Sequence, residues 1–236
     1  MISVQALQKR FGRLEVLQSL NLELRAGECI ALLGPNGCGK TTLIKSILGM
    51  VLPDSGTITF EGEDIRRNNQ YRAQIGYMPQ IGRYPENMSI RQVIDMIRGI
   101  RQEQQGISEA LYAQFGIEKM LDKKMRTLSG GTTQKVSAVL AFMFNPKVLI
   151  LDEPTAGLDP VAAEILKNRI IAEKEKGRLI LITSHLLSEL EDLASEVVFM
   201  QEGQVLFHKK TPQLKADTGQ ETLAKAIVTL LKSGKA

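Results

Sequence analysis

The sequence predicts an α/β protein whose core is a buried parallel β-sheet, with an antiparallel β layer near the N-terminus and a helical subdomain. Short aliphatic runs alternate with longer helical patterns, and strands covered on both faces have this continuous apolar composition. The segments SVQAL, LNLEL and GTITFEG instead alternate apolar with polar residues, which is typical of antiparallel strands with one face in solvent. From residue 81 to residue 144 helical spacing replaces the strand signals. The expected core strands are residues 29–33, 148–151, 179–183 and 197–200.

These patterns divide the chain, residues 1–236, into the parts of a single domain. Residues 1–80 and 145–210 are expected to form the core with its antiparallel layer, and residues 81–144 the helical subdomain. The tail, residues 211–236, is expected to form a short amphipathic helix, because Leu223, Ile227, Leu230 and Leu231 recur at helical spacing. Within the subdomain, helices are expected at residues 90–100, 108–115 and 131–144, with loops that contain Gly106 and Gly116.

The composition excludes several classes of protein. Apolar residues make up 43% and charged residues 24%, the balance of a globular protein rather than of a disordered, collagen-like or coiled-coil chain. The net charge of +4 is too small to indicate a nucleic-acid surface. Two cysteines, Cys29 and Cys38, and two histidines suggest neither a disulfide framework nor a zinc site. No apolar run approaches the roughly 18 to 20 residues that span a bilayer, and no signal peptide is visible, so the chain is expected to be cytoplasmic.

A glycine-rich segment matches the pattern G-x-x-x-x-G-K-[ST], in which backbone N–H groups wrap around phosphates. It stands between the expected strand 29–33 and an expected helix at 41–48, the context that the pattern requires. In this pattern Lys40 reaches the β- and γ-phosphates, and the Thr41 hydroxyl binds Mg²⁺. A glycine-rich turn without a ligand is the less favoured alternative. The residues expected to line the cradle are Gly34, Pro35, Asn36, Gly37, Cys38, Gly39, Lys40, Thr41 and Thr42.

Polar residues follow two of the expected core strands. Asp152 and Glu153 end the run VLILDEP, and alternation is expected to place them on opposite sides of the strand. Beside a phosphate loop, Asp152 can hold Mg²⁺ and Glu153 can polarise a water towards the γ-phosphate. His185 follows the strand 179–183, so we expect it at the same sheet edge, within reach of the γ-phosphate. The plainer alternatives are ordinary strand-end acids and a packed or surface histidine; a further carboxylate, Asp159, follows in AGLD.

A second candidate phosphate site is the segment Leu128-Ser-Gly-Gly-Thr132, which stands just before an expected helix. Ser129 supplies a hydroxyl, while Gly130 and Gly131 expose N–H groups at the positive end of the helix. A simple helix cap is the alternative interpretation.

Taken in order, the phosphate loop, Gln80 after IGYMP, LSGG, LILDEP, GLD and His185 resemble the nucleotide-binding subunit of an ABC transporter over residues 1 to about 210. The resemblance implies a P-loop NTPase (RecA-like) fold that binds ATP and Mg²⁺. It further implies that Phe11 stacks on adenine and that Gln80 ligates Mg²⁺ together with Thr41 and Asp152. Residues 81–90 are then expected to offer a groove for a helix of a membrane partner.

The resemblance also implies a head-to-tail dimer of two copies, or of this chain and a paralogous ATPase. The phosphate loop of one subunit and Ser129, Gly130 and Gly131 of the other would sandwich each ATP, with Asp159 reporting across the interface. Catalysis would fall to Glu153, His185, Lys40 and Gln80. Two positions depart from the family pattern, Thr132 in place of Gln and Lys135 in place of Arg, and we expect activity to survive both.

The favoured function is an ATP-hydrolysing subunit that couples dimer closure to transport by separate permease subunits, on the cytoplasmic face of the membrane. Export is slightly favoured, because no C-terminal regulatory domain of the kind found in many importers follows the core. The main alternative is an ABC ATPase that acts on ribosomes or DNA, yet the chain shows neither a second nucleotide domain nor a coiled-coil or zinc insertion. A regulatory nucleotide binder without turnover is disfavoured because Glu153 and His185 are present. A narrower alternative is the ATPase used with copper-site maturation of nitrous-oxide reductase.

Overall fold

The computed structural model describes residues 1–101 and 110–233, and its chain forms two compact units. The first comprises Met1–Arg72 with Leu179–Ala236, and the second Ala73–Arg178. The two units are described separately below, and the division into core, helical subdomain and tail stays a prediction. Besides the elements named below, the chain has short 3₁₀ turns at Gln70–Gln74, Ile117–Met120, Met125–Thr127 and Leu187–Leu190.

The first unit begins with an antiparallel sheet, as the alternating N-terminal segments predict. Its strand order is β2-β1-β4-β5. Along β2, Leu20, Leu22 and Leu24 are buried while the residues between them are exposed. This one-sided burial is what the apolar–polar alternation requires. The strands are β1 (Ile2–Phe11), β2 (Leu14–Leu24), β4 (Ser55–Phe60) and β5 (Glu63–Asp64).

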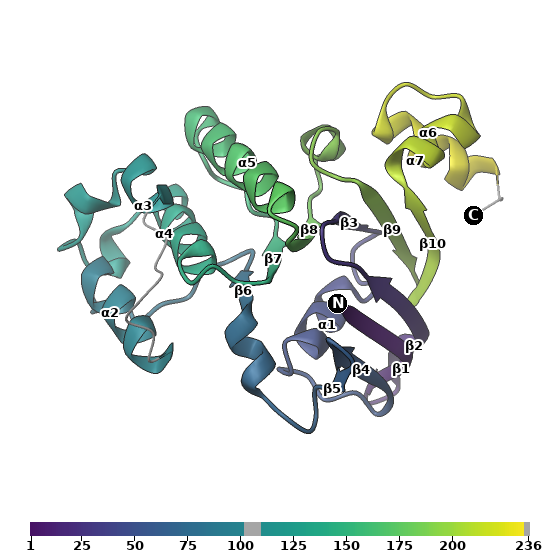
Figure 1. Ribbon diagram of the computed structural model, residues 1–236, viewed down its shortest axis with the longest axis horizontal. Helices are drawn as coiled ribbons and strands as arrows, with labels where there is room; N and C mark the ends of the chain where they lie inside the picture. The colour runs from purple at the N-terminus through teal and green to yellow at the C-terminus, as the bar shows by residue number, and fades with distance from the viewer. Residues whose placement is uncertain (102–109, 234–236) are drawn as a thin grey trace. The chain divides into compact units, whose positions relative to one another are not determined.

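The second sheet of this unit has a parallel centre. In it β3 (Cys29–Leu33) lies between β8 (Leu179–Thr183) and β9 (Glu196–Gln201), parallel to both (Figure 1). Every residue of β3 and β8 is buried, as the continuous apolar runs predict. The chain leaves β3 directly into the glycine-rich loop and α1 (Lys40–Ile47). An edge strand, β10 (Gln204–Lys210), pairs antiparallel with β9; its polar alternation did not single it out in the sequence.

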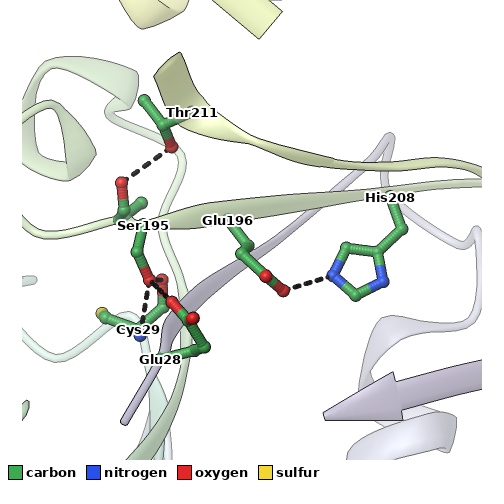
Figure 2. Close-up of polar contacts among 7 residues, drawn as sticks. Glu28, Cys29, Ser195, Glu196, His208 and Thr211 are labelled. Carbon is green, nitrogen blue, oxygen red and sulfur yellow. Dashed lines mark hydrogen bonds and ion pairs between the residues drawn. The ribbon is translucent and has the colours of Figure 1, made fainter. Parts of the chain in front are cut away.

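Polar side chains tie the start of β3 to the β9–β10 hairpin (Figure 2). The Ser195 hydroxyl accepts a hydrogen bond from the Cys29 N–H at 3.0 Å and donates to the Glu28 carboxylate. On the neighbouring strand, His208 Nε2 lies 2.7 Å from the buried carboxylate of Glu196. The Ser195 contacts join the start of β9 to β3, the His208–Glu196 pair joins β10 to β9, and both satisfy polar groups that burial would otherwise penalise.

The C-terminal tail forms two helices, α6 (Thr211–Thr218) and α7 (Leu223–Ser233), where the sequence predicted one. Gly219 ends α6 in the left-handed conformation, with φ of 65°, which reverses the chain. The predicted apolar face of the second helix is confirmed, since Leu223, Ile227 and Leu230 are buried. Figure 1 shows both helices beyond the end of β10.

The second unit combines a parallel strand pair with helices. Its strands, β6 (Ile75–Met78) and β7 (Val148–Asp152), run parallel; β6 is so short that the sequence did not indicate it. The predicted helical segment is confirmed, although residues 108–109 of the expected helix 108–115 and the Gly106 loop lie outside the described residues. The helices are α2 (Ile90–Arg101), α3 (Ala110–Gln114), α4 (Gly130–Phe142) and α5 (Pro160–Glu175).

Candidate functional site

The glycine-rich loop follows β3 in a conformation that demands its glycines. Gly34 and Gly39 have φ of 143° and 107°. A Cβ atom at Gly34 would lie 2.1 Å from the Met200 carbonyl oxygen, and one at Gly39 would lie 2.8 Å from that of Val16. Close packing against the hairpin and β2 therefore requires these two glycines before any ligand is considered.

The loop leads into the N-terminus of α1, whose cap is Gly39 and has no side-chain cap hydrogen bond. Its first N–H groups are left for another partner, and an anion suits the positive end of the helix. The Lys40 ammonium folds back over the loop and donates to the carbonyl oxygens of Gly34 at 2.7 Å and Pro35 at 3.1 Å. Thr41 beside it is exposed, whereas Cys38 is buried. The arrangement is a cationic cradle open at a helix end.

His185 leaves the same sheet edge as the glycine-rich loop, because β3 and β8 are paired and parallel. This expected placement is confirmed, and its catalytic role stays a prediction. The turn around it is held by Ser184, whose hydroxyl accepts from the Leu186 N–H at 3.0 Å and lies 3.2 Å from Glu189 Oε2.

Phe11, the predicted adenine-stacking residue, ends β1 with 50% of its surface exposed. The Lys9 ammonium lies 5.3 Å from the centroid of its ring. One ring is therefore presented to solvent at the end of a strand, where it has room to accept a flat partner.

In the second unit Asp152 is the last residue of β7 and Glu153 leaves the strand. Glu153 adopts a left-handed conformation with φ of 50°, so the alternation expected to separate the two carboxylates does not extend to it. Gln80 is exposed two residues beyond β6, at the same end of the parallel pair as Asp152.

Two residues that the sequence reasoning missed lie close to Asp152 and Glu153. Gln134 is buried in α4, and its side-chain amide lies 3.3 Å from the Glu153 carbonyl oxygen and 3.4 Å from that of Pro154. Its neighbours in the sequence, Thr133 and Lys135, are polar, so no local signal marks Gln134 as a buried residue. Tyr77 lies on β6, where burial and the negative charge of Asp152 raise the pKa of its hydroxyl.

The segment Leu128 to Thr132 forms the N-terminus of α4, as predicted. Ser129 is the cap: its hydroxyl accepts from the Thr132 N–H at 3.2 Å and lies 2.9 Å from the Thr132 hydroxyl. Gly130 faces open space, whereas a Cβ on Gly131 would lie 2.5 Å from the Gly157 carbonyl oxygen. Only the first glycine is therefore free of packing demands, and it leaves room above the helix end.

Asp159 caps the next helix, α5, by accepting from the Ala162 N–H at 2.9 Å. The Lys135 ammonium lies 2.7 Å from its other oxygen and joins α4 to this cap. The Lys135 hydrogen bond and the Ala162 N–H together hold the pKa of Asp159 below its ordinary value. Lys thus serves as a charge partner at the position where the family pattern has Arg.

Among the residues that the structure describes, no helix has the length and apolar composition needed to cross a bilayer.

The predicted site residues are divided between the units. Phe11, residues 34–42 and His185 belong to the first unit. The second unit holds the remaining ones, Gln80, Ser129, Gly130, Gly131, Asp152, Glu153 and Asp159.

Comparison with known proteins identifies this arrangement. Residues 17–156 match the family described as ABC transporter. The chain is 32% identical over 222 residues to Nod factor export ATP-binding protein I of Ralstonia nicotianae. The match covers 90% of this chain and 68% of that protein. It is 33% identical over 214 residues to lantibiotic transport ATP-binding protein SrtF of Streptococcus pyogenes, 89% of this chain and 91% of that one.

A solved structure of an ATP-binding subunit of an ABC transporter has the same fold, with a TM-score of 0.88 at 29% identity. The match covers 98% of this chain and 99% of that structure. The family match, the relatives and the shared fold agree with the order of motifs along the sequence. The chain belongs to the ABC transporter family, as an ATP-binding subunit and ATPase.

Proposed function

We propose that two such subunits close head to tail around ATP and so drive substrate movement by separate membrane-spanning permease subunits. The observation that carries the proposal is the pair of helix N-termini, α1 in one unit and α4 in the other, both suited to phosphate. In a symmetric dimer the end of α1 from one copy and the end of α4 from its partner hold one ATP, which yields two equal sites.

Binding falls mainly to the first unit. Lys40 exchanges its loop carbonyl partners for the β- and γ-phosphates, and Phe11 stacks on the base. The expected magnesium ligands, Thr41, Gln80 and Asp152, offer hydroxyl, amide and carboxylate oxygens, the donor types that Mg²⁺ prefers. When bound, Mg²⁺ neutralises charge that develops on the phosphates.

Hydrolysis falls to groups at the ends of strands. Glu153 orients the attacking water, and the Gln134 amide holds the backbone of that residue in place. His185 contacts the γ-phosphate. Gln80 links the bound nucleotide to the segment that follows Gln80 in the chain. Asp159 acts across the dimer interface. Loss of the γ-phosphate removes the group that joins the two subunits, and the dimer opens.

The permease contact is proposed for residues 81–90, next to a cavity of about 380 Å³. The Tyr84 hydroxyl lies 2.9 Å from the Ser137 hydroxyl on α4, which fixes one wall. Backbone hydrogen bonds from Met125 to Met88 and from Arg126 to Glu86 support the other side. The cavity is lined by Gly82, Arg83, Tyr84, Glu86, Met125, Arg126 and Thr133. Export is the favoured direction, supported by the names of the Nod factor export and lantibiotic transport relatives.

The proposal is tested with tagged Glu153→Gln protein, which is expected to bind ATP, hydrolyse it poorly and remain a closed dimer. The protein is loaded with ATP and Mg²⁺, recovered from detergent-solubilised membranes of its own source, and its co-purifying chains are identified by mass spectrometry. A multi-span permease is the expected partner, and Glu153→Gln/Ser129→Arg is the matched control that cannot close. Ribosomal proteins or DNA in place of a permease would contradict the transport proposal and leave the ATPase assignment intact.

A further inference from the structure

A second cavity, lined by none of the residues proposed to bind nucleotide or permease, opens on the first unit. Its volume is about 420 Å³, within the roughly 300 to 1,000 Å³ range of small-ligand sites. It lies between the end of α1 and the segment after β5. The residues that matter to its chemistry are Leu52, Ile65, Arg66, Arg67, Asn68 and Arg72.

The cavity is lined by three arginines, and Asp64, the acid on which the charges of Arg66 and Arg67 act, offsets only part of their charge. No acidic side chain lines it. Asp64 is engaged by the Arg66 guanidinium at 2.7 Å, and Asp54 lies 2.9 Å from the Lys9 ammonium. Within the described parts of the chain, the Arg67 side chain forms no hydrogen bond or ion pair. The lining therefore presents the guanidinium of Arg67 without a directly paired carboxylate, which favours an anionic ligand.

Two polar groups of the cavity, the Arg72 guanidinium and the Asn68 amide, are held in position. Arg72 donates to the Gly49 carbonyl oxygen at 3.2 Å, and its guanidinium carbon lies 5.9 Å from the centroid of the Tyr71 ring. A Cβ on Gly49 would lie 2.4 Å from Arg72 Nη2, so this glycine leaves the space that the arginine occupies. The Asn68 side-chain oxygen accepts from the Gln70 N–H at 2.8 Å, which leaves its NH₂ group as a donor. A guanidinium and an amide NH₂ group held in place in this way are suitable donors to the oxygens of a phosphate.

The rim adds an apolar component. Leu52 lines the cavity and is 72% exposed, and Met50 nearby in the chain is 64% exposed. Cationic groups beside exposed aliphatic side chains are typical of surfaces that enter the interfacial layer of an anionic membrane. A partner helix about 10 Å across would need an extended groove, whereas this cavity has the volume of a small-ligand site.

We propose that this cavity binds the phosphate of an anionic phospholipid head group, with Met50 and Leu52 entering the lipid interface. The proposal goes beyond ATP hydrolysis and uses only the membrane location that the proposed transport function implies. Its role is to add a direct lipid contact to the contact made through the permease.

The experiment is sedimentation of the purified full chain with vesicles of phosphatidylcholine alone or with phosphatidylglycerol added, while ATPase activity is followed in parallel. Wild-type protein is expected to bind the anionic vesicles only. Arg67→Gln should weaken that binding about fivefold, the effect of one interfacial arginine, without changing ATPase activity. Arg25→Gln is the control, since it removes the same charge from an exposed turn away from the cavity. Equal losses from both variants would mean unspecific attraction and overturn the proposal.

A second pair of measurements identifies the source of the phosphate. Leu52→Ser should reduce vesicle binding but leave the binding of soluble glycerol phosphate, followed by NMR shifts of the Arg67 side chain, unchanged. Binding of glycerol phosphate without any vesicle binding would overturn the lipid assignment, as would binding of acidic permease peptides alone. Because the ATPase assay and the permease pull-down do not depend on this cavity, failure here is distinguishable from failure of the proposed function.

Discussion

The helix α1 begins at a bare glycine beside a lysine, whereas α4 begins at a serine whose hydroxyl already accepts a hydrogen bond from its own helix. The first terminus has uncapped N–H groups and a cation folded back over the loop that precedes them, so it can hold a polyphosphate within one subunit. At the N-terminus of α4, the Thr132 N–H is already bonded to Ser129, and the Ser129 hydroxyl is the group offered to a ligand. From this difference we expect α1 to supply most of the nucleotide affinity and α4 to contact a nucleotide that is already bound.

Lys40→Ala is expected to have the largest effect, because it removes the cation from the terminus that carries most of the affinity. ATPase activity should fall by roughly 100-fold or more, the range for loss of a charged transition-state donor. Activity is followed by phosphate release, and binding by the fluorescence of an ATP analogue. Lys40→Arg serves as the control for charge alone, and it should also be impaired because the planar guanidinium does not fit the lysine position. Unchanged turnover in Lys40→Ala would remove α1 from its role.

Ser129→Arg should block the other terminus without touching the first. A bulky cation at the cap of α4 fills the room that Gly130 leaves open, so the dimer should fail to close while one subunit still binds ATP normally. The measurement is size-exclusion chromatography in the Glu153→Gln background with ATP, with Ser129→Ala as a milder control. Weaker ATP binding by the Ser129→Arg monomer would mean that α4 contributes to ATP binding within its own subunit. That result would contradict the division of roles between α1 and α4.

The sequence predicted the first terminus better than the second. The glycine-rich loop, its strand and its helix are adjacent in the chain, so a local pattern contains almost everything that fixes their geometry. Its hidden demands are the approach of Met200 to Gly34 and of Val16 to Gly39, which come from a distant hairpin and from β2. The buried strands β3, β7 and β8 were equally predictable, because continuous apolar runs have few other solutions.

Around the second terminus, contacts between distant residues decide the structure. Gly131 must be small because the Gly157 carbonyl approaches it, and Gln134 is set by the backbone at Glu153. Nothing in the local pattern states either requirement. The left-handed conformation of Glu153 is likewise invisible to an argument from strand alternation. The four-residue strand β6 escaped notice for a similar reason, since its pairing with β7 and not its composition makes it a strand.

Thr132 offers a finer test of how α4 presents its hydroxyl. If the Thr132 hydroxyl donates to Ser129 across their 2.9 Å separation, both acceptor sites of Ser129 are occupied, and its own O–H is free to donate to a phosphate oxygen. Thr132→Val keeps the shape but loses that donor, so closure should require several-fold more ATP, the effect of about 1 kcal/mol for one hydrogen bond. Thr132→Ser retains the donor and should behave as wild type. Equal behaviour of the two variants, measured as ATP-dependent dimerisation, would show that Thr132 does not orient Ser129.

The smallest expected effect concerns the charge pair that joins α4 to the cap of α5. Asp159 has a lowered pKa, first through its hydrogen bond with Lys135 and then through the Ala162 N–H, so its carboxylate is fully charged at neutral pH. A lowered pKa in the folded state gives stabilisation that is present above the unfolded-state pKa and is lost as the pH falls through the folded-state pKa. Lys135→Met should therefore move the titration of Asp159 to higher pH and cause the α5 cap to weaken earlier on acidification. Carboxyl-carbon NMR measures this shift directly, with Lys119→Met as a control on the same unit. An unmoved titration would assign the low pKa to the helix N-terminus alone, and Lys135 would then couple α4 to Asp159 without tuning the charge of that residue.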